Sequence, residues 1–191
     1  LPLGKLILTA FIATLIFVCI TYLPIIKLIG MKISDYLKGA FEPWLIAFTT
    51  CSSAAALAVN LEASRKMGAS KAIASFAIPL GNTINMNGTS IYMGVTAVFA
   101  AEVFGIDLTL TQQFQIVLMG VLAAVGTAGV PGAGLIMTTL VFTEVGIPLE
   151  AVALIAGIDR ILDMIRTSVN VLGDSLTALV VSKSEGVLGT E

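Results

Sequence analysis

The stretch that decides the fold is DRILDMIRTSVNVLGD, which runs from Asp159 to Asp174. Read as a helix, it carries five polar or charged side chains at offsets of 0, 4, 7, 11 and 15 residues: Asp159, Asp163, Arg166, Asn170 and Asp174. At about 100° per residue these side chains share an arc of about 80°. Thr167 flanks the same arc. The stretch is therefore predicted to be an apolar helix with one polar stripe.

The chain around this stretch is much more apolar than a soluble domain. Of its 191 residues, 57% are hydrophobic and 12% are charged, whereas soluble domains carry about 25% charged residues. About 20 apolar residues span a bilayer as a helix, so at least three of the charge-free stretches are expected to reach across. A very apolar soluble helical core is the alternative, and the low charge content argues against it. The charge-free stretches are Leu6–Ile26, Pro43–Leu61, Ala72–Ala101 and Leu108–Thr143.

Several classes of function are excluded by composition. The chain has no histidine, so it lacks His-based catalysis and His-containing zinc sites. Cys19 and Cys51 have no CxxC spacing and are interpreted as packing thiols. A net charge of −2 with scattered basic residues indicates no nucleic-acid partner. Neither an enzyme nor an organic cofactor is expected.

The chain divides into six segments, with a hairpin and a polar helix occurring twice. Each hairpin has arms too short to cross the membrane and is expected to be re-entrant. Paired interrupted segments are the best sequence indication of a transporter's binding site. The predicted fold class is an all-α membrane protein with transmembrane helices, two re-entrant helical hairpins and an interrupted helix. The segments are a transmembrane helix (1–33), hairpin 1 (34–69), the interrupted helix (70–105), hairpin 2 (106–147), a polar transmembrane helix (148–183) and a cytoplasmic tail (184–191).

Two helix boundaries follow from local signals. Ser34 is expected to cap a helix that continues through Trp44 to about Thr50. The last helix is expected to run unbroken from about Glu150 to Ser182. Because the chain begins at Leu1 without Met, it is expected to be a segment of a longer protein.

The charges predict the orientation in the membrane. In the predicted layout, seven basic residues fall in connections on one side of the membrane. The connections on the other side contain acidic residues and no Lys or Arg. By the positive-inside rule, hairpin 1 enters from the cytoplasm, hairpin 2 enters from outside, and the C-terminus is cytoplasmic. We expect a multi-pass protein of a bacterial or archaeal plasma membrane. The basic set is Lys27, Lys32, Lys38, Arg65, Lys66, Lys71 and Lys183, and the acidic set is Glu102, Asp107, Glu144 and Glu150.

The polar stripe carries the strongest functional signal. Charges at membrane depth cost several kcal/mol each, so they face the protein interior or a wet cavity and mark an ion or substrate path. The alternative is that ion pairs of Arg166 with Asp163 and Asp159 only hold helices together. Carboxylates outnumber cations in the stripe, however, and structural pairs would not need Asn170 and Asp174.

Two helix-breaking motifs accompany the stripe. Asn85-Met86-Asn87-Gly88 is expected to unwind a spanning helix and free carbonyl oxygens for a hard cation; the alternative is a kink satisfied by neighbouring helices. Gly126–Gly134 lets the backbone approach a ligand, unless it is a flexible turn. At the first tip, the hydroxyls of Ser52 and Ser53 and the helix N-terminal amides favour an anionic group.

Together these motifs resemble the glutamate transporter family, the dicarboxylate/amino-acid:cation symporters. Four pieces occur in the family's order, and the match is dense from about Thr49 to Gly186. The resemblance implies a homotrimer in which each subunit moves an elevator-type transport domain against a fixed scaffold. By the same resemblance, that scaffold and one transport-domain helix are expected to lie outside the residues given. The partners implied are an amino-acid substrate and membrane lipid. The four pieces are Cys51-Ser52-Ser53, Pro79–Thr89, Gly126–Gly134 and Asp163–Asp174.

Carried over by position, the resemblance implies that Arg166 pairs with the substrate's side-chain carboxylate and that Asp163 holds its amino group. An Arg fork suits a carboxylate, and a carboxylate one turn away suits an ammonium, so an acidic amino acid is favoured. The other substrate contacts would be Ser53, Thr89, Thr167, Asn170 and the Val130 backbone. One sodium site would use Asn85, Asn170, Asp174 and the Gly81 carbonyl, and another would use Thr83 with backbone carbonyls around Ala124, Val125 and Thr127.

Departures from the family leave alternatives open. Asn87 stands where an Asp usually binds a further sodium, so the coupling ions are sodium ions, protons or both. The second arginine that many members have at the position of Cys51 or Met164 is missing, and Arg160 is a candidate substitute. The expected function is symport of glutamate or aspartate. The alternatives are another carboxylate-bearing amino acid such as cystine, a C4-dicarboxylate, or an uncoupled channel-like or receptor-like protein.

Overall fold

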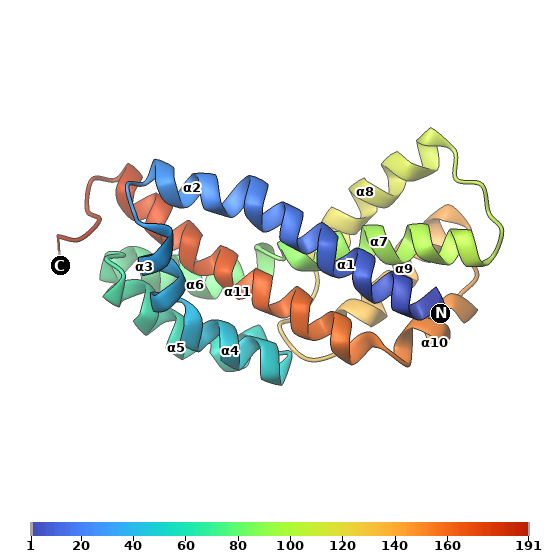
Figure 1. Cartoon of the computed structure of the whole chain (residues 1–191), viewed down its shortest axis with the longest axis horizontal. Coiled ribbons are helices and arrows are strands. Elements are labelled where there is room, and N and C mark those ends of the chain that lie inside the picture. Colours follow the sequence, from blue (N-terminus) through green and yellow to red (C-terminus); the bar gives the residue numbers. More distant parts are fainter. Residues whose placement is uncertain (1, 191) are drawn as a thin grey trace.

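The computed structural model describes residues 2–190, and every regular element in that range is a helix. The predicted all-α class is therefore confirmed (Figure 1). The first six elements are α1 (Pro2–Phe17), the π-helical segment η1 (Val18–Tyr22), α2 (Leu23–Leu28), α3 (Ile33–Gly39), α4 (Phe41–Thr50) and α5 (Ser53–Lys66). The others are α6 (Lys71–Ile84), α7 (Asn87–Val103), α8 (Leu110–Val125), α9 (Ala133–Val145), α10 (Glu150–Ala156) and α11 (Asp159–Ser184).

Elements α1, η1 and α2 form one continuous apolar helix, Pro2–Leu28. Within the described residues it is the one helix that is both long and apolar enough to cross a membrane by the criteria of length and composition. We expected at least three stretches to span the membrane, but only one of them is an unbroken helix of sufficient length and apolarity within the described residues. The reason is that the later apolar stretches are divided, by Asn85 and Met86 between α6 and α7 and by residues 126–132 between α8 and α9.

Two expected helix boundaries are wrong. The last helix is interrupted at Gly157 and Ile158, which separate α10 from α11. Ser34 is not the expected cap, because Lys32 occupies the N-cap position of α3 without a side-chain hydrogen bond. Ala40 then divides the segment expected to run to Thr50 into α3 and α4. Spacing of apolar residues does not resolve breaks of only one or two residues.

Helix α11 is the centre of the packing. It contacts α4, α5, α6, α7 and α1, and in Figure 1 it runs along the long axis with α1 and α2 on one side and α4 and α5 on the other. The pairs α4–α5 and α8–α9 each form a helical hairpin. The carbonyl oxygens of Val169 and Leu172 in α11 accept hydrogen bonds from the hydroxyls of Tyr22 (3.1 Å) and Tyr36 (2.6 Å). These bonds orient α11 against η1 and α3.

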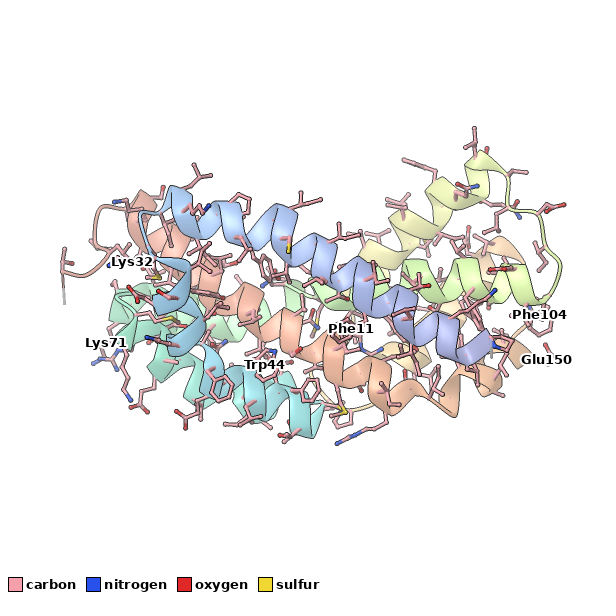
Figure 2. The ribbon with its side chains drawn as sticks, viewed as in Figure 1. Phe11, Lys32, Trp44, Lys71, Phe104 and Glu150 are labelled. Atoms are coloured by element: carbon pink, nitrogen blue, oxygen red, sulfur yellow. The ribbon has the colours of Figure 1, made fainter. Side chains whose placement is uncertain are left out.

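The hydrophobic core consists of two main clusters joined end to end. One is built mainly from α1, α7, α8, α9 and α10 and reaches α11 at Leu162. The other combines residues of η1, α2, α3 and α6 with four residues of α11, namely Val169, Leu176, Ala178 and Leu179. The polar stripe of α11 therefore crosses from one cluster to the other. Figure 2 places Lys32 and Lys71 at one end of the molecule and Phe104 and Glu150 at the opposite end.

Candidate functional site

A polar pocket lies where the tips of the two hairpins meet α7 and α11. Its cavity volume is about 10 Å³, which is roughly the room that one water molecule needs, so a solute can enter only if a hairpin tip moves. The whole polar stripe is buried, each member being at most 6% exposed, as the sequence predicted. The cavity brings together all seven predicted substrate residues: Ser53, Thr89, Val130, Asp163, Arg166, Thr167 and Asn170.

The guanidinium of Arg166 is held rigidly in the cavity wall. Its Nη2 and Nε atoms lie 2.8 and 3.2 Å from Oδ1 of Asp163, and its Nη1 atom lies 3.9 Å from Asp159. The ring of Tyr92 lies under the guanidinium, 4.3 Å from Cζ to the ring centroid. Both ion pairs considered from the sequence are therefore present. Nη1 nevertheless has no hydrogen-bond partner, so one edge of a buried cation is left for an anion.

Asp163 joins α11 to the second hairpin tip. Its Oδ1 also accepts a hydrogen bond from the Thr167 hydroxyl at 2.7 Å, and its Oδ2 accepts one from the Gly132 backbone N–H at 2.8 Å. A buried carboxylate needs such donors because its desolvation is otherwise unfavourable. Oδ2 of Asp163 therefore holds one hydrogen bond to the second tip, and a carboxylate oxygen can accept a further one.

The two hairpin tips bind each other directly. The Ser52 hydroxyl and the Ala54 N–H both donate to the Gly129 carbonyl, at 2.9 and 3.2 Å. Next to this junction the Ser53 hydroxyl and the Asn82 side-chain oxygen are buried without hydrogen-bond partners. A Cβ atom on Gly129 would overlap the Ser53 hydroxyl, so glycine is required for the tips to meet.

Asn82 was missed by sequence reasoning. It lies in the quoted motif Pro79–Thr89, but nothing in its spacing predicted that α6 would place it against Gly129. Val130, by contrast, is a predicted substrate contact, and its side chain is 51% exposed. Val130 therefore lies at the outer wall of the cavity.

Asn170 connects the cavity to the break between α6 and α7. Its side-chain oxygen accepts a hydrogen bond from the Gly88 N–H at 2.8 Å, and its amide nitrogen lies 3.1 Å from both the Thr89 hydroxyl and the Met86 sulfur. The first N–H groups of a helix lack intrahelical partners, and Asn170 satisfies one of those of α7. A Cβ atom on Gly88 would overlap the Arg166 carbonyl, so α7 and α11 are in close backbone contact here.

A second polar cluster lies on the other side of the break. Asn85 donates to Oδ1 of Asp174 at 2.9 Å, and Asn87 donates to the Asn85 side-chain oxygen at 2.7 Å and to the Tyr22 hydroxyl at 3.0 Å. A Cβ atom on Gly81 would lie 2.5 Å from Oδ1 of Asp174. Tyr22 was also missed, because it is far from the motifs in sequence.

The donor set of this cluster has a clear chemical preference. It combines one carboxylate with side-chain amides, a hydroxyl and backbone, and the described residues contain no group of three or more His, Cys, Asp or Glu side chains able to hold a metal ion. Oxygen ligands of this kind suit hard cations. The cluster therefore fits a weakly held monovalent cation better than a transition metal.

The other predicted cation set is not assembled by hydrogen bonds within residues 2–190. The hydroxyl of Thr83 donates to Leu80, and that of Thr127 donates to Ala123, each at 2.8 Å within its own helix or helix end. Thr127 and Ala124 are buried, whereas Thr83 and Val125 are exposed. The role of this set stays a prediction.

Comparison with known proteins gives consistent matches. A family model described as the sodium:dicarboxylate symporter family matches residues 1–184. The chain is 38% identical over 191 residues to the proton/sodium-glutamate symport protein of Geobacillus stearothermophilus, covering 100% of the chain and 45% of the relative. It is 37% identical to the proton/glutamate-aspartate symporter of Escherichia coli (strain K12), covering 96% and 42%. It is 38% identical to the C4-dicarboxylate transport protein of Bacillus subtilis (strain 168), covering 96% and 44%. The chain thus spans less than half the length of each of these relatives.

Proposed function

Because this chain belongs to the sodium:dicarboxylate symporter family, we propose that it forms the substrate-binding half of a membrane symporter for glutamate or aspartate. Relatives named as glutamate and glutamate-aspartate symporters support this substrate class. The observation that carries the proposal is the buried Arg166–Asp163 pair, in which Nη1 of Arg166 has no hydrogen-bond partner. A cation and a carboxylate side by side match the carboxylate and the ammonium of an acidic amino acid.

The geometry suggests how each end of the substrate binds. The side-chain carboxylate would accept hydrogen bonds from Nη1 of Arg166. The ammonium would bind Oδ2 of Asp163 beside or in place of the Gly132 N–H. Because the pocket volume is only about 10 Å³, entry of the substrate would require movement of a hairpin tip. The α-carboxylate would meet the Ser53 hydroxyl and the N-terminal amides of α5, where the helix dipole favours an anion.

Cations, as co-transported cargo, would bind the cluster of Asp174, Asn85 and Asn87. This cluster and the substrate cavity lie on opposite sides of one helix break, and Asn170 bonds to the first turn of α7. Ordering of that break by a cation would place Thr89 and Asn170 for the substrate, which is a physical route for coupling. Sodium ions, protons or both would serve.

The membrane arrangement belongs to the same proposal. Hairpins α4–α5 and α8–α9 would be re-entrant, with the end that carries Lys32 and Lys71 in the cytoplasm (Figure 2). The chain would be part of an elevator-type transport domain that moves against a scaffold in a homotrimer. The large exposed apolar side chains on α1 and α8, among them Leu15 and Phe114, would face lipid or that scaffold.

Transport of radiolabelled aspartate into proteoliposomes containing the full-length protein tests the proposal. Uptake driven by an inward sodium or proton gradient is expected. No uptake under either gradient would contradict it, and passage without any gradient would favour an uncoupled channel.

A C4-dicarboxylate is the second candidate substrate, because a relative of that name is 38% identical over a similar part of the chain. A plain dicarboxylate has no ammonium for Asp163. We therefore expect unlabelled glutamate or aspartate to compete with labelled aspartate, and succinate or cystine to compete more weakly. Stronger competition by succinate would transfer the assignment to dicarboxylates.

Gly134→Ala is expected to weaken aspartate binding about tenfold with little change in maximal uptake. A Cβ atom at Gly134 would overlap the Arg166 guanidinium, which Asp163 and Tyr92 prevent from moving freely. A shift of the guanidinium costs affinity on the order of 1 kcal/mol. The measurement is aspartate uptake as a function of concentration. Gly126→Ala is the matched control on the same tip, because its Cβ would meet nothing closer than 3.5 Å; equal effects of the two changes would refute the explanation.

A further inference from the structure

We infer that Arg160 is a positioning residue that clamps the tip of the first hairpin, α4–α5, to the start of α11. Its guanidinium does not line the substrate pocket. It lies instead against the C-terminal end of α4. Nη2 donates to the Thr49 carbonyl at 2.8 Å, and Nη1 lies 3.5 Å from the Thr50 carbonyl. The clamp is a feature of the geometry, and its effect on transport rests on the proposed function.

The two acceptors are the last two residues of α4. The final carbonyl groups of a helix have no partners within the helix, and the helix dipole makes that end negative. A cation is therefore favourable there, and the planar fork of arginine can serve two neighbouring carbonyls where a lysine presents a compact point charge. Arg160 supplies from another helix the partners that α4 lacks.

Cys51, the residue after α4, explains why this end of the helix needs a contact from another helix. Cys51 has φ 56° and ψ 33° and is the one non-glycine residue with positive φ among residues 2–190. That conformation is unfavourable for a residue with a Cβ atom and persists only when the surroundings hold it. The Cys51 thiol lies 3.8 Å from the Arg160 carbonyl oxygen. Arg160 thus contacts the turn with both its side chain and its backbone.

The clamped turn carries the residues that complete the site. Ser52 bonds to Gly129 of the second tip, and Ser53 lines the substrate cavity. Asp163 and Arg166 follow Arg160 within two turns on the same helix. Arg160 therefore sets the position of the first tip relative to the Asp163–Arg166 pair. Without the clamp, the tip can withdraw while the pair itself stays intact.

The natural Cys51 thiol reports on the clamp without any transport measurement. In the full-length protein, with every other cysteine including Cys19 replaced by serine, Cys51 would be labelled with a membrane-permeant maleimide. Cys51 is 1% exposed, so labelling requires the tip to open. Arg160→Gln is expected to raise the labelling rate about five- to tenfold, because a partly exposed charge-assisted bond is lost. Arg160→Lys, which keeps the charge and loses the fork, is expected to lie in between.

Arg65→Gln is the matched control, since it removes the same charge from the last turn of α5 at the far end of the same hairpin. An unchanged Cys51 labelling rate in Arg160→Gln, or an equal increase in Arg65→Gln, would overturn the clamp. If Arg160→Gln protein does not reach the membrane, the Arg160→Lys rate decides: faster labelling than in the parent supports the clamp, and the parent rate overturns it.

Transport kinetics separate a positioning role from a general structural one. Arg160→Gln is expected to raise the KM for aspartate several-fold with Vmax nearly unchanged, and Arg160→Lys is expected to recover part of the affinity. A fall in Vmax alone would contradict positioning of the first tip. Failure of aspartate uptake in the parent protein would count against the proposed function, whereas the labelling result would still decide the clamp.

Discussion

Arg166→Gln is expected to abolish aspartate uptake at low aspartate concentration, lowering the apparent affinity by about 30-fold or more. The guanidinium is 4% exposed, and its Nη1 atom, 3.9 Å from Asp159, is the one buried cationic donor among the described pocket residues without a hydrogen-bond partner. Removal of one member of a buried, hydrogen-bonded charge pair costs about 2–5 kcal/mol, and each 1.4 kcal/mol is tenfold in affinity. Arg166→Lys keeps the charge but loses the fork, so it is expected to restore only a small part of the affinity. The measurement is aspartate uptake over a range of concentrations.

Loss of uptake could also follow from misfolding, because Asp163 and Asp159 would lose their cation. A neutral amino acid distinguishes the two causes. With Asp163 still able to hold an ammonium, we expect Arg166→Gln protein to bind serine or alanine better than aspartate, and the parent protein to prefer aspartate. Arg65→Gln, a change at an exposed arginine, should leave both properties unaltered. Retained preference for aspartate in Arg166→Gln protein would refute the role given to Arg166.

Asp174→Asn is expected to remove the dependence of uptake on the cation gradient, with at least a tenfold loss of gradient-driven uptake. Asp174 is 2% exposed and is the one carboxylate in its cluster with Asn85 and Asn87. The change keeps the shape of the side chain and deletes the charge that would attract a cation. Initial rates of aspartate uptake would be measured against sodium concentration and, separately, against pH. Those two series also reveal which cation is coupled.

Asp35→Asn is the control for Asp174→Asn, because Asp35 is exposed and bonds only locally, to Ser34. An unchanged response to both sodium and pH in Asp174→Asn protein would exclude this cluster as the coupling site. Gly81→Ala tests the same cluster without changing a charge. Its Cβ atom would lie 2.5 Å from Oδ1 of Asp174, whereas a Cβ atom on Gly94 meets nothing within 4 Å. We expect weaker cation dependence in Gly81→Ala and none of this effect in Gly94→Ala.

Much of the helical layout was predictable because it depends on local chemistry. The polar stripe of α11 has helical periodicity, and Gly126–Gly134 and the Asn85-Met86-Asn87-Gly88 motif contain residues that disfavour a continuous helix. The break at Gly157 and Ile158 was not predicted, since one glycine in an apolar run is compatible with an unbroken helix. The absence of a cap at Ser34 was missed for a similar reason: a capping residue type does not ensure a capping bond.

The site divides in the same way. Asp163, Arg166, Asn170 and Asp174 were identifiable from the sequence because charged and amide groups at a single helix face are costly in an apolar chain unless they are used. Tyr22 and Asn82 were not identifiable. Neither belongs to a polar stripe along its own helix, and its relevance depends on which helix it packs against.

The sequence by itself therefore determined an all-helical, very apolar chain, the interruptions at Asn85–Gly88 and Gly126–Gly134, and the residues that could bind charge, because each follows from composition or from spacing along one helix. The tertiary structure alone decided which of these groups meet. It joined the tips through Ser52 and Gly129, left Nη1 of Arg166 without a hydrogen-bond partner, and placed the Arg160 guanidinium on the Thr49 carbonyl at the end of α4. Such contacts join residues tens of positions or more apart in the chain, and their geometry depends on packing of several helices at once, which no local pattern encodes.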